Sequence, residues 1–121
     1  MSAIAELPVK WGEALNVLRY RPGEEYRVHH DFLSPEDPEL AARGQRIRTA
    51  LLYLNDGYKG GETHFLEPDI RISAKAGDVL VFDNVDEKGA PDVSARHAGS
   101  PVETGVKWLA TIWFRDRDFF V

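Results

Sequence analysis

Residues 26–33 read YRVHHDFL, an extended segment that is typical of a β-strand. In a strand, residues i and i+2 face the same side with Cα atoms about 7 Å apart, so His29 and Asp31 can share one metal ion while His30 faces away. A further histidine, His97, lies in the sequence SARHAGSPV, just before the last strong strand signal. Two histidines and one carboxylate form the facial triad that holds non-haem Fe(II) and leaves coordination positions open. These residues predict an iron site that joins two strands.

Other interpretations of the same residues stay open at this point. A His-x-Asp pair on an exposed strand can be solvated polar surface, and His97 can simply satisfy a local backbone group. His64, in GGETHF, is a competing ligand, and Glu62 or Glu67 beside it could serve a different metal. The choice depends on the wider sequence pattern.

Strand signals and turns alternate along the whole chain. Turn residues cluster in RPGEE and NDGYKGG, and Ser34 or Asp37 can cap a short helix that ends at Gly44. The predicted strands cover residues 14–20, 26–33, 47–54, 63–66, 70–73, 78–83, the segment around His97, and 107–115. Eight short strands with one short helix predict a mainly β protein, a jelly roll or a similar barrel.

The composition fits one compact domain. A chain of 121 residues buries about two thirds of the surface that it exposes when unfolded, which is enough for one core. The net charge of −5 argues against nucleic acid as a partner. The absence of cysteine excludes disulfides and favours a cytoplasmic location. No apolar run approaches the ~20 residues that cross a bilayer, and residues 1–12 lack the pattern of a signal peptide, so we expect no membrane partner.

Four segments carry a more specific signal: VLRYRPGEEYRVHHDF, RIRTALLYLNDGYKGGETHF, AGDVLVFDN and ARHAGSPVETGVKWLATIWFR. Together they resemble the catalytic domain of the prolyl 4-hydroxylase family of Fe(II)/2-oxoglutarate dioxygenases, from about Glu13 to Arg115. The resemblance implies a double-stranded β-helix, the jelly-roll or cupin-like core. It also implies that residues 1–121 form one catalytic domain without the helical portion that usually precedes it. A natural minimal form, an excised fragment, or a homodimer that buries the exposed sheet would each explain this difference, and a polar outer face is the alternative to the homodimer.

The resemblance assigns roles to the predicted site. It implies that the three triad residues ligate Fe(II) and that Lys107 binds the distal carboxylate of 2-oxoglutarate. A carboxylate inside a barrel needs a cation, and lysine supplies a compact positive charge. The alternative is that Lys107 begins a strand with its ammonium in solvent. Tyr20 and Thr63 match positions whose hydroxyls hydrogen-bond to 2-oxoglutarate, although each could be an ordinary strand residue.

Three further positions concern the substrate. By the resemblance, Arg46 and Arg115 lie near the mouth of the site, and Trp113 belongs to the same active-site strand as Arg115. An arginine at a rim is often only a solubilising charge, and Trp113 could be part of the core. The family often has histidine near the position of Arg115, so the substrate contacts of this chain are expected to differ.

The function implied by the resemblance is hydroxylation of a substrate C–H bond, with peptidyl proline as the leading substrate. The reaction uses Fe(II), 2-oxoglutarate and O2, optionally with ascorbate, and releases succinate and CO2. A free amino acid or another small molecule is the alternative substrate, because the loops that hold substrates vary most. An alternative from a different functional class is a non-catalytic jelly-roll domain that binds metal or ligand, or a truncated fragment. Such a domain would not need all three triad residues together with Lys107.

Overall fold

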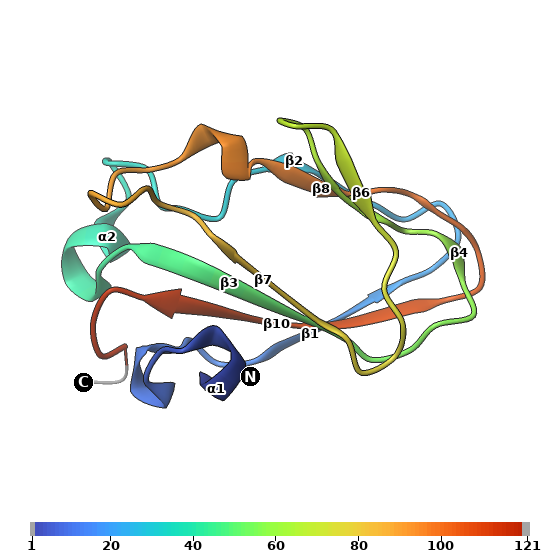
Figure 1. Cartoon of the computed structure of the whole chain (residues 1–121), viewed down its shortest axis with the longest axis horizontal. Helices are drawn as coiled ribbons and strands as arrows, with labels where there is room; N and C mark the ends of the chain where they lie inside the picture. Colours follow the sequence, from blue (N-terminus) through green and yellow to red (C-terminus); the bar gives the residue numbers. More distant parts are fainter. Residues whose placement is uncertain (1, 120–121) are drawn as a thin grey trace.

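Two four-stranded antiparallel sheets face each other as two layers (Figure 1). The computed structural model describes residues 2–119. The major sheet has the order β1-β10-β3-β7 and is built from β1 (Asn16–Tyr20), β3 (Arg46–Tyr53), β7 (Val79–Asp83) and β10 (Lys107–Arg115). The minor sheet has the order β2-β8-β5-β6 and is built from β2 (Tyr26–His29), β5 (Thr63–Phe65), β6 (Ile70–Ile72) and β8 (His97–Gly99). A further pair, β4 (Lys59–Gly60) with β9 (Val102–Thr104), lies at one end. The predicted mainly β jelly roll is confirmed.

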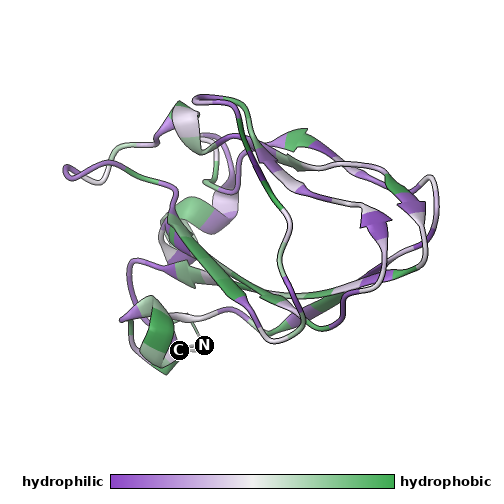
Figure 2. Cartoon of the chain, turned by 45° about the vertical axis from the view of Figure 1, so that its right-hand side comes forward, coloured by the Kyte–Doolittle hydropathy of each residue, from purple (hydrophilic) through white to green (hydrophobic). Residues whose placement is uncertain are grey.

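Side-chain alternation along β3 and β10 gives the major sheet two different faces. Leu109 lies opposite Tyr53 in the register of the two strands, and both belong to a buried cluster with Leu51. Ala50 and Phe114, on the alternate positions, belong to a second buried cluster. Figure 2 shows the hydrophobic residues concentrated along this sheet. The cluster of Leu51, Tyr53 and Leu109 is the inner cluster, and it is available to form the floor of a site between the sheets. The cluster of Ala50 and Phe114, on the opposite face, is the outer cluster.

The N-terminal residues cover part of the outer face of the major sheet. Helix α1 (Ser2–Ala5) and the 3-10 helix η1 (Val9–Trp11) lie beneath it, with Ala5 buried and Trp11 packed on the outer cluster. The sequence interpretation placed no helix here and expected this face to be uncovered. The structure corrects that expectation in part, since Val17 and Trp108 elsewhere on the face are 53% and 40% exposed.

The predicted short helix is α2 (Pro38–Arg43). Asp37 is its N-cap, with a carboxylate oxygen that accepts from the backbone N–H of Glu39 at 2.9 Å. Gly44 follows the helix with a φ of 82°, a conformation that favours glycine. A 3-10 helix, η2 (Val93–Ala95), leads into β8. No helix in the described range 2–119 is long and apolar enough to cross a membrane.

The strand predicted over residues 26–33 ends early, at His29. Beyond it, the Gln45 side chain bonds both backbone groups of Leu33, accepting from its N–H at 2.6 Å and donating to its C=O at 3.0 Å. The backbone of Leu33 therefore bonds to a side chain instead of a neighbouring strand. Asp31 lies in this irregular segment.

Candidate active site

His29 and His97 lie side by side on two neighbouring strands of the minor sheet. His29 ends β2, His97 begins β8, and the two residues are direct partners in the antiparallel register. Nε2 of His29 lies 3.3 Å from Oδ1 of Asp31, and Nε2 of His97 lies 3.7 Å from Oδ2 of the same residue. The potential ligand atoms of the three residues all lie within 4.8 Å of one another. The structure thus brings together the three residues predicted from the sequence.

Backbone carbonyls set the orientation of both imidazoles. Nδ1 of His29 lies 2.6 Å from the carbonyl oxygen of Arg27, and Nδ1 of His97 lies 2.8 Å from that of Ala95. A carbonyl can only accept, so each Nδ1 carries the hydrogen and each Nε2 presents its lone pair toward Asp31. Lone pairs and a carboxylate that converge at this distance require a cation or a proton among them. This donor set, with its carbonyl-oriented imidazoles, fits a divalent transition metal.

The protonation tendencies agree with this arrangement. Asp31 is 5% exposed. Burial raises its pKa, but the contacts with His29 and Thr49 and the charge that His97 can carry outweigh burial and hold the pKa below its ordinary value. Burial lowers the pKa of His97, and Asp31 only partly offsets this effect. For His29, burial is outweighed by the contacts with Asp31 and the Arg27 carbonyl, which raise the pKa.

The competing histidines lie elsewhere. His30 is exposed and stacks on Phe32 at a ring-centroid distance of 3.8 Å. Nε2 of His64 lies 2.6 Å from a carboxylate oxygen of Asp69. Glu67 lies 3.4 Å from Arg96. Among residues 2–119, the group of His29, Asp31 and His97 is the one whose ligand atoms converge.

A pocket between the sheets contains this group together with Lys107. The Lys107 side chain is almost fully buried and donates from Nζ to the carbonyl oxygen of Gly61 at 2.7 Å. Nζ also lies 5.4 Å from the ring centre of Tyr20 and 5.8 Å from that of Tyr53. Burial lowers the pKa of Lys107 to about 8, against the opposing charge of Glu62. Within the described chain no carboxylate forms an ion pair with Lys107, and a buried ammonium in this state fits an anionic ligand. The pocket lining comprises Leu18, Tyr20, Tyr26, His29, Asp31, Leu51, Thr63, His97, Ala98, Gly99, Lys107, Leu109, Thr111 and Trp113.

The two predicted hydroxyl residues also line this pocket. Burial raises the pKa of Tyr20 to about 12, so its phenol keeps its proton and can donate a hydrogen bond. The Thr63 hydroxyl is buried and hydrogen-bonded to the hydroxyl of Tyr53. Tyr53 was not predicted as a site residue. Its position two residues beyond the inward-facing Leu51 on β3 is the signal that could have found it.

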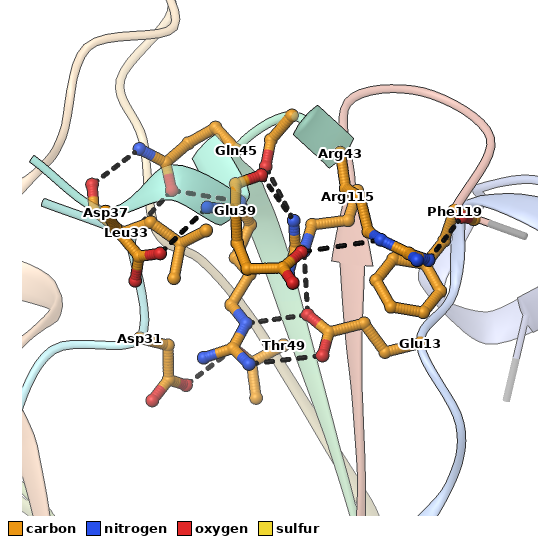
Figure 3. A network of polar contacts seen from close by, with 12 residues as sticks. Glu13, Asp31, Leu33, Asp37, Glu39, Arg43, Gln45, Thr49, Arg115 and Phe119 are labelled. Atoms are coloured by element: carbon orange, nitrogen blue, oxygen red, sulfur yellow. Dashed lines mark hydrogen bonds and ion pairs between the residues drawn. The ribbon is translucent and has the colours of Figure 1, made fainter. Parts of the chain in front are cut away.

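The three residues predicted for the substrate side take different positions. Trp113 lines the pocket, and the Arg46 guanidinium stacks over its ring at 4.3 Å. Arg115 is buried, with Nε donating to a carboxylate oxygen of Glu13 at 2.7 Å and a guanidinium nitrogen donating to the Gly44 carbonyl at 2.8 Å. Figure 3 shows the Glu13 carboxylate beside Arg115. Arg46 donates to the same carboxylate at 2.6 Å and 3.1 Å. The structure therefore places Arg115 in a buried ion pair, where we expected a residue near the mouth of the site.

Residues 15–115 match the sequence profile of the 2OG-Fe(II) oxygenase superfamily. The chain belongs to this superfamily. It is 41% identical over 120 residues to a putative prolyl 4-hydroxylase of Acanthamoeba polyphaga mimivirus, covering 93% of the chain and 49% of the relative. It is 32% identical over 130 residues to prolyl 4-hydroxylase 1 of Arabidopsis thaliana, covering 97% and 46%. The chain thus spans about half the length of these curated relatives.

A solved structure of the superfamily matches the fold. The viral collagen prolyl hydroxylase of Paramecium bursaria Chlorella virus-1, in its 2OG complex, superposes with a TM-score of 0.72 at 32% identity. The match covers 86% of this chain and 59% of the viral protein. The expected double-stranded β-helix and the family resemblance are both confirmed.

This superfamily member contains supporting residues that the sequence analysis did not single out. Glu13 pairs with two arginines, and although burial raises its pKa, these hydrogen bonds and charges lower it overall. Gln45 holds the segment that carries Asp31, and Thr49 and Asn84 are completely buried. Thr49 had a visible signal, because it is a polar residue within an apolar strand. Glu13, Gln45 and Asn84 had none, since their partners are far away in the sequence.

Proposed function

We propose that this chain is the catalytic domain of an Fe(II)- and 2-oxoglutarate-dependent dioxygenase that hydroxylates peptidyl proline and releases succinate and CO2. One observation carries the proposal: three convergent metal-ligand candidates face the same pocket as a buried lysine that has no carboxylate partner among residues 2–119. A domain that only bound metal would need the first feature and not the second. The prolyl hydroxylase names of the relatives support the choice of substrate.

In this proposal, His29, Asp31 and His97 bind Fe(II), and Lys107 binds the distal carboxylate of 2-oxoglutarate, with Tyr20 and Thr63 as hydroxyl partners. Bound Fe(II) and 2-oxoglutarate supply the activation of O2 and the oxidising power for hydroxylation. The chain supplies placement: carbonyl-oriented imidazoles hold the metal, and Lys107 fixes the far end of the cosubstrate. The apolar pocket walls exclude water from the reaction.

The substrate side favours a peptide over a free amino acid. Arg46 and Arg115 are both paired with Glu13, so neither is an open partner for the free carboxylate of an amino acid. Trp113 and Tyr26 line the pocket with aromatic surface, which suits the ring of a prolyl residue. We propose that Trp113 and Arg46 contact the substrate. We also propose that Arg115 holds the Glu13 carboxylate in place, to which Arg46 is bonded as well.

The test is an anaerobic Fe(II) titration followed by a succinate assay with a proline-rich peptide. We expect one Fe(II) per chain and succinate formation that increases when the peptide is added. Fe(II) binding without succinate would support the non-catalytic metal-binding domain instead. Absence of both would indicate a fragment that requires further residues, and equal turnover with free proline would identify the small-molecule alternative.

The proposal has four further parts. We propose that residues 1–121 act as a single domain and that ascorbate serves as an accessory reductant, as the family resemblance implies. A homodimer through the exposed outer face around Val17 and Trp108 would remove apolar surface from water. We also propose a cytoplasmic location, which the cysteine-free sequence favours.

A further inference from the structure

A buried chain of three polar side chains leads from the major sheet to the candidate metal site. Asn84, directly after β7, donates from Nδ2 to the Thr49 hydroxyl at 2.9 Å. Thr49, on β3, donates to Oδ2 of Asp31 at 2.7 Å. Asn84 and Thr49 are each 0% exposed. Figure 3 shows Thr49 close to Asp31.

The direction of the two hydrogen bonds follows from the chemistry of the end groups. An ionised carboxylate can only accept, so the Thr49 hydroxyl must give its single hydrogen to Asp31. The oxygen of that hydroxyl then needs a donor, and the amide nitrogen of Asn84 is the group that can supply one. The Asn84 amide therefore occupies the acceptor side of the Thr49 hydroxyl, and the Thr49 hydrogen is left for Asp31.

We propose that Thr49 and Asn84 are positioning residues of the metal site, which fix the rotation of the Asp31 carboxylate. The inference rests on the proposed function, because it takes Asp31 as a metal ligand. Asp31 lies beyond the end of β2 and has no ladder hydrogen bonds to hold it. Gln45 fixes the backbone two residues later, and Thr49 holds the carboxylate itself. Partners that hold a ligating carboxylate in this way commonly change metal affinity about 10- to 100-fold when they are removed.

The experiment compares two variants of Thr49 with Co(II) alone as the probe, under argon. Thr49→Val keeps the shape but removes the hydroxyl, and Thr49→Ser keeps the hydroxyl. We expect Thr49→Val to weaken Co(II) binding about 10-fold or more and to shift the visible absorption bands of the bound Co(II). Thr49→Ser should restore both the affinity and the bands. Thr104→Val, at an exposed threonine on β9, is the control and should bind Co(II) like the parent.

The role of Asn84 is tested through coupling. Asn84→Ala should weaken Co(II) binding less than Thr49→Val, and the double variant should bind no more weakly than Thr49→Val alone, because Asn84 acts through Thr49. Additive losses would overturn the relay. Unchanged Co(II) affinity and bands in Thr49→Val would overturn the positioning role of Thr49.

Two controls separate this inference from the proposed function. If the parent protein fails to bind Co(II), or if Asp31→Ala binds it equally well, the proposed metal site itself is wrong. If the parent binds Co(II) and Thr49→Val binds it equally well, only the inference fails. Should Thr49→Val not fold, a crystal structure of the Co(II)-loaded parent decides: the Thr49 hydroxyl must still donate to Asp31, and a hydroxyl turned away from the carboxylate would overturn the proposal.

Discussion

Asp31 and His30 are neighbours in the sequence with opposite surroundings, and this difference gives a direct test of the site. Asp31→Ala removes the buried carboxylate between the two imidazoles, so micromolar Fe(II) binding should be abolished. His30→Ala, at the exposed ring that stacks on Phe32, should leave Fe(II) binding unchanged. Anaerobic calorimetry measures both. Equal losses in the two variants would mean that the metal lies elsewhere.

The buried ammonium of Lys107 predicts a pH dependence of cosubstrate binding. Its pKa of about 8 means that the amine of the free protein is neutral above that pH. Above that pH the amine must take up a proton from solvent when the carboxylate binds, so affinity for 2-oxoglutarate should decrease above about pH 8, by up to about tenfold per pH unit. Calorimetric titration of the Co(II)-loaded protein at several pH values measures this dependence.

Two variants of Lys107 serve as its controls. Lys107→Arg keeps its charge at every pH in this range, so its affinity should not decrease above pH 8 even if the absolute value is lower. Lys107→Ala should weaken 2-oxoglutarate binding at least about tenfold while Co(II) binding persists, because the carboxylate loses its buried cation. An affinity of the parent that does not change with pH would assign the carboxylate to another cation.

Single residues differed in how well the sequence could place them. The His-x-Asp spacing and the family resemblance placed His29, Asp31, His97 and Lys107 around one pocket. The burial of Arg115 could not be predicted, because it depends on Glu13, which is distant in sequence and follows no motif. Polar residues whose partners are set only by the fold leave no local signal.

At the scale of elements, the irregular segment after β2 depends on Gln45. Gln45→Ala leaves a buried N–H and C=O of Leu33 without partners, at a cost of about 1–3 kcal/mol for an unsatisfied buried group. Urea unfolding should show this loss of stability. Co(II) affinity should also decrease, since the segment carries Asp31.

Asn55 provides a matched control for Gln45. Its amide also bridges two backbone groups, donating to the Val106 carbonyl at 2.7 Å and accepting from the Trp108 N–H at 2.7 Å. Water can reach these groups, so Asn55→Ala should cost less stability and leave Co(II) affinity unchanged. A Gln45→Ala variant that behaves like Asn55→Ala would show that the segment holds its shape without the side-chain bridge.

The predictability of each element follows the range of the interactions that form it. Long alternating or apolar runs such as those of β3 and β10 were predictable, because burial on a sheet imposes the pattern directly. The two-residue strand β4 is too short for a pattern. The early end of β2 and the presence of α1 depend on contacts with Gln45 and with the outer face of the major sheet, which only the folded chain supplies.

At the scale of the whole molecule, the outer face around Val17 and Trp108 predicts self-association. Exposed apolar side chains beside the edge strand β1 favour a two-fold contact that buries the same patch on both copies. Light scattering over a dilution series should show dimers that dissociate on dilution, and Val17→Lys should abolish them. Val93→Lys, at a more exposed valine on η2, should not. A parent protein that stays monomeric at high concentration would contradict the dimer.

The placement of the triad has a consequence for the motion of the two layers. His29 and His97 belong to the minor sheet, while Asp31 is hydrogen-bonded to Thr49 of the major sheet. A metal held by all three would therefore tie the layers together at one end, and each separation of the layers would require its release. Amide hydrogen exchange should then slow in β2 and β8 when Co(II) is added and change little in the centre of β3. Equal protection of all strands would mean that the metal stabilises the chain only globally, whereas selective protection would make the metal the regulator of how often the two layers come apart.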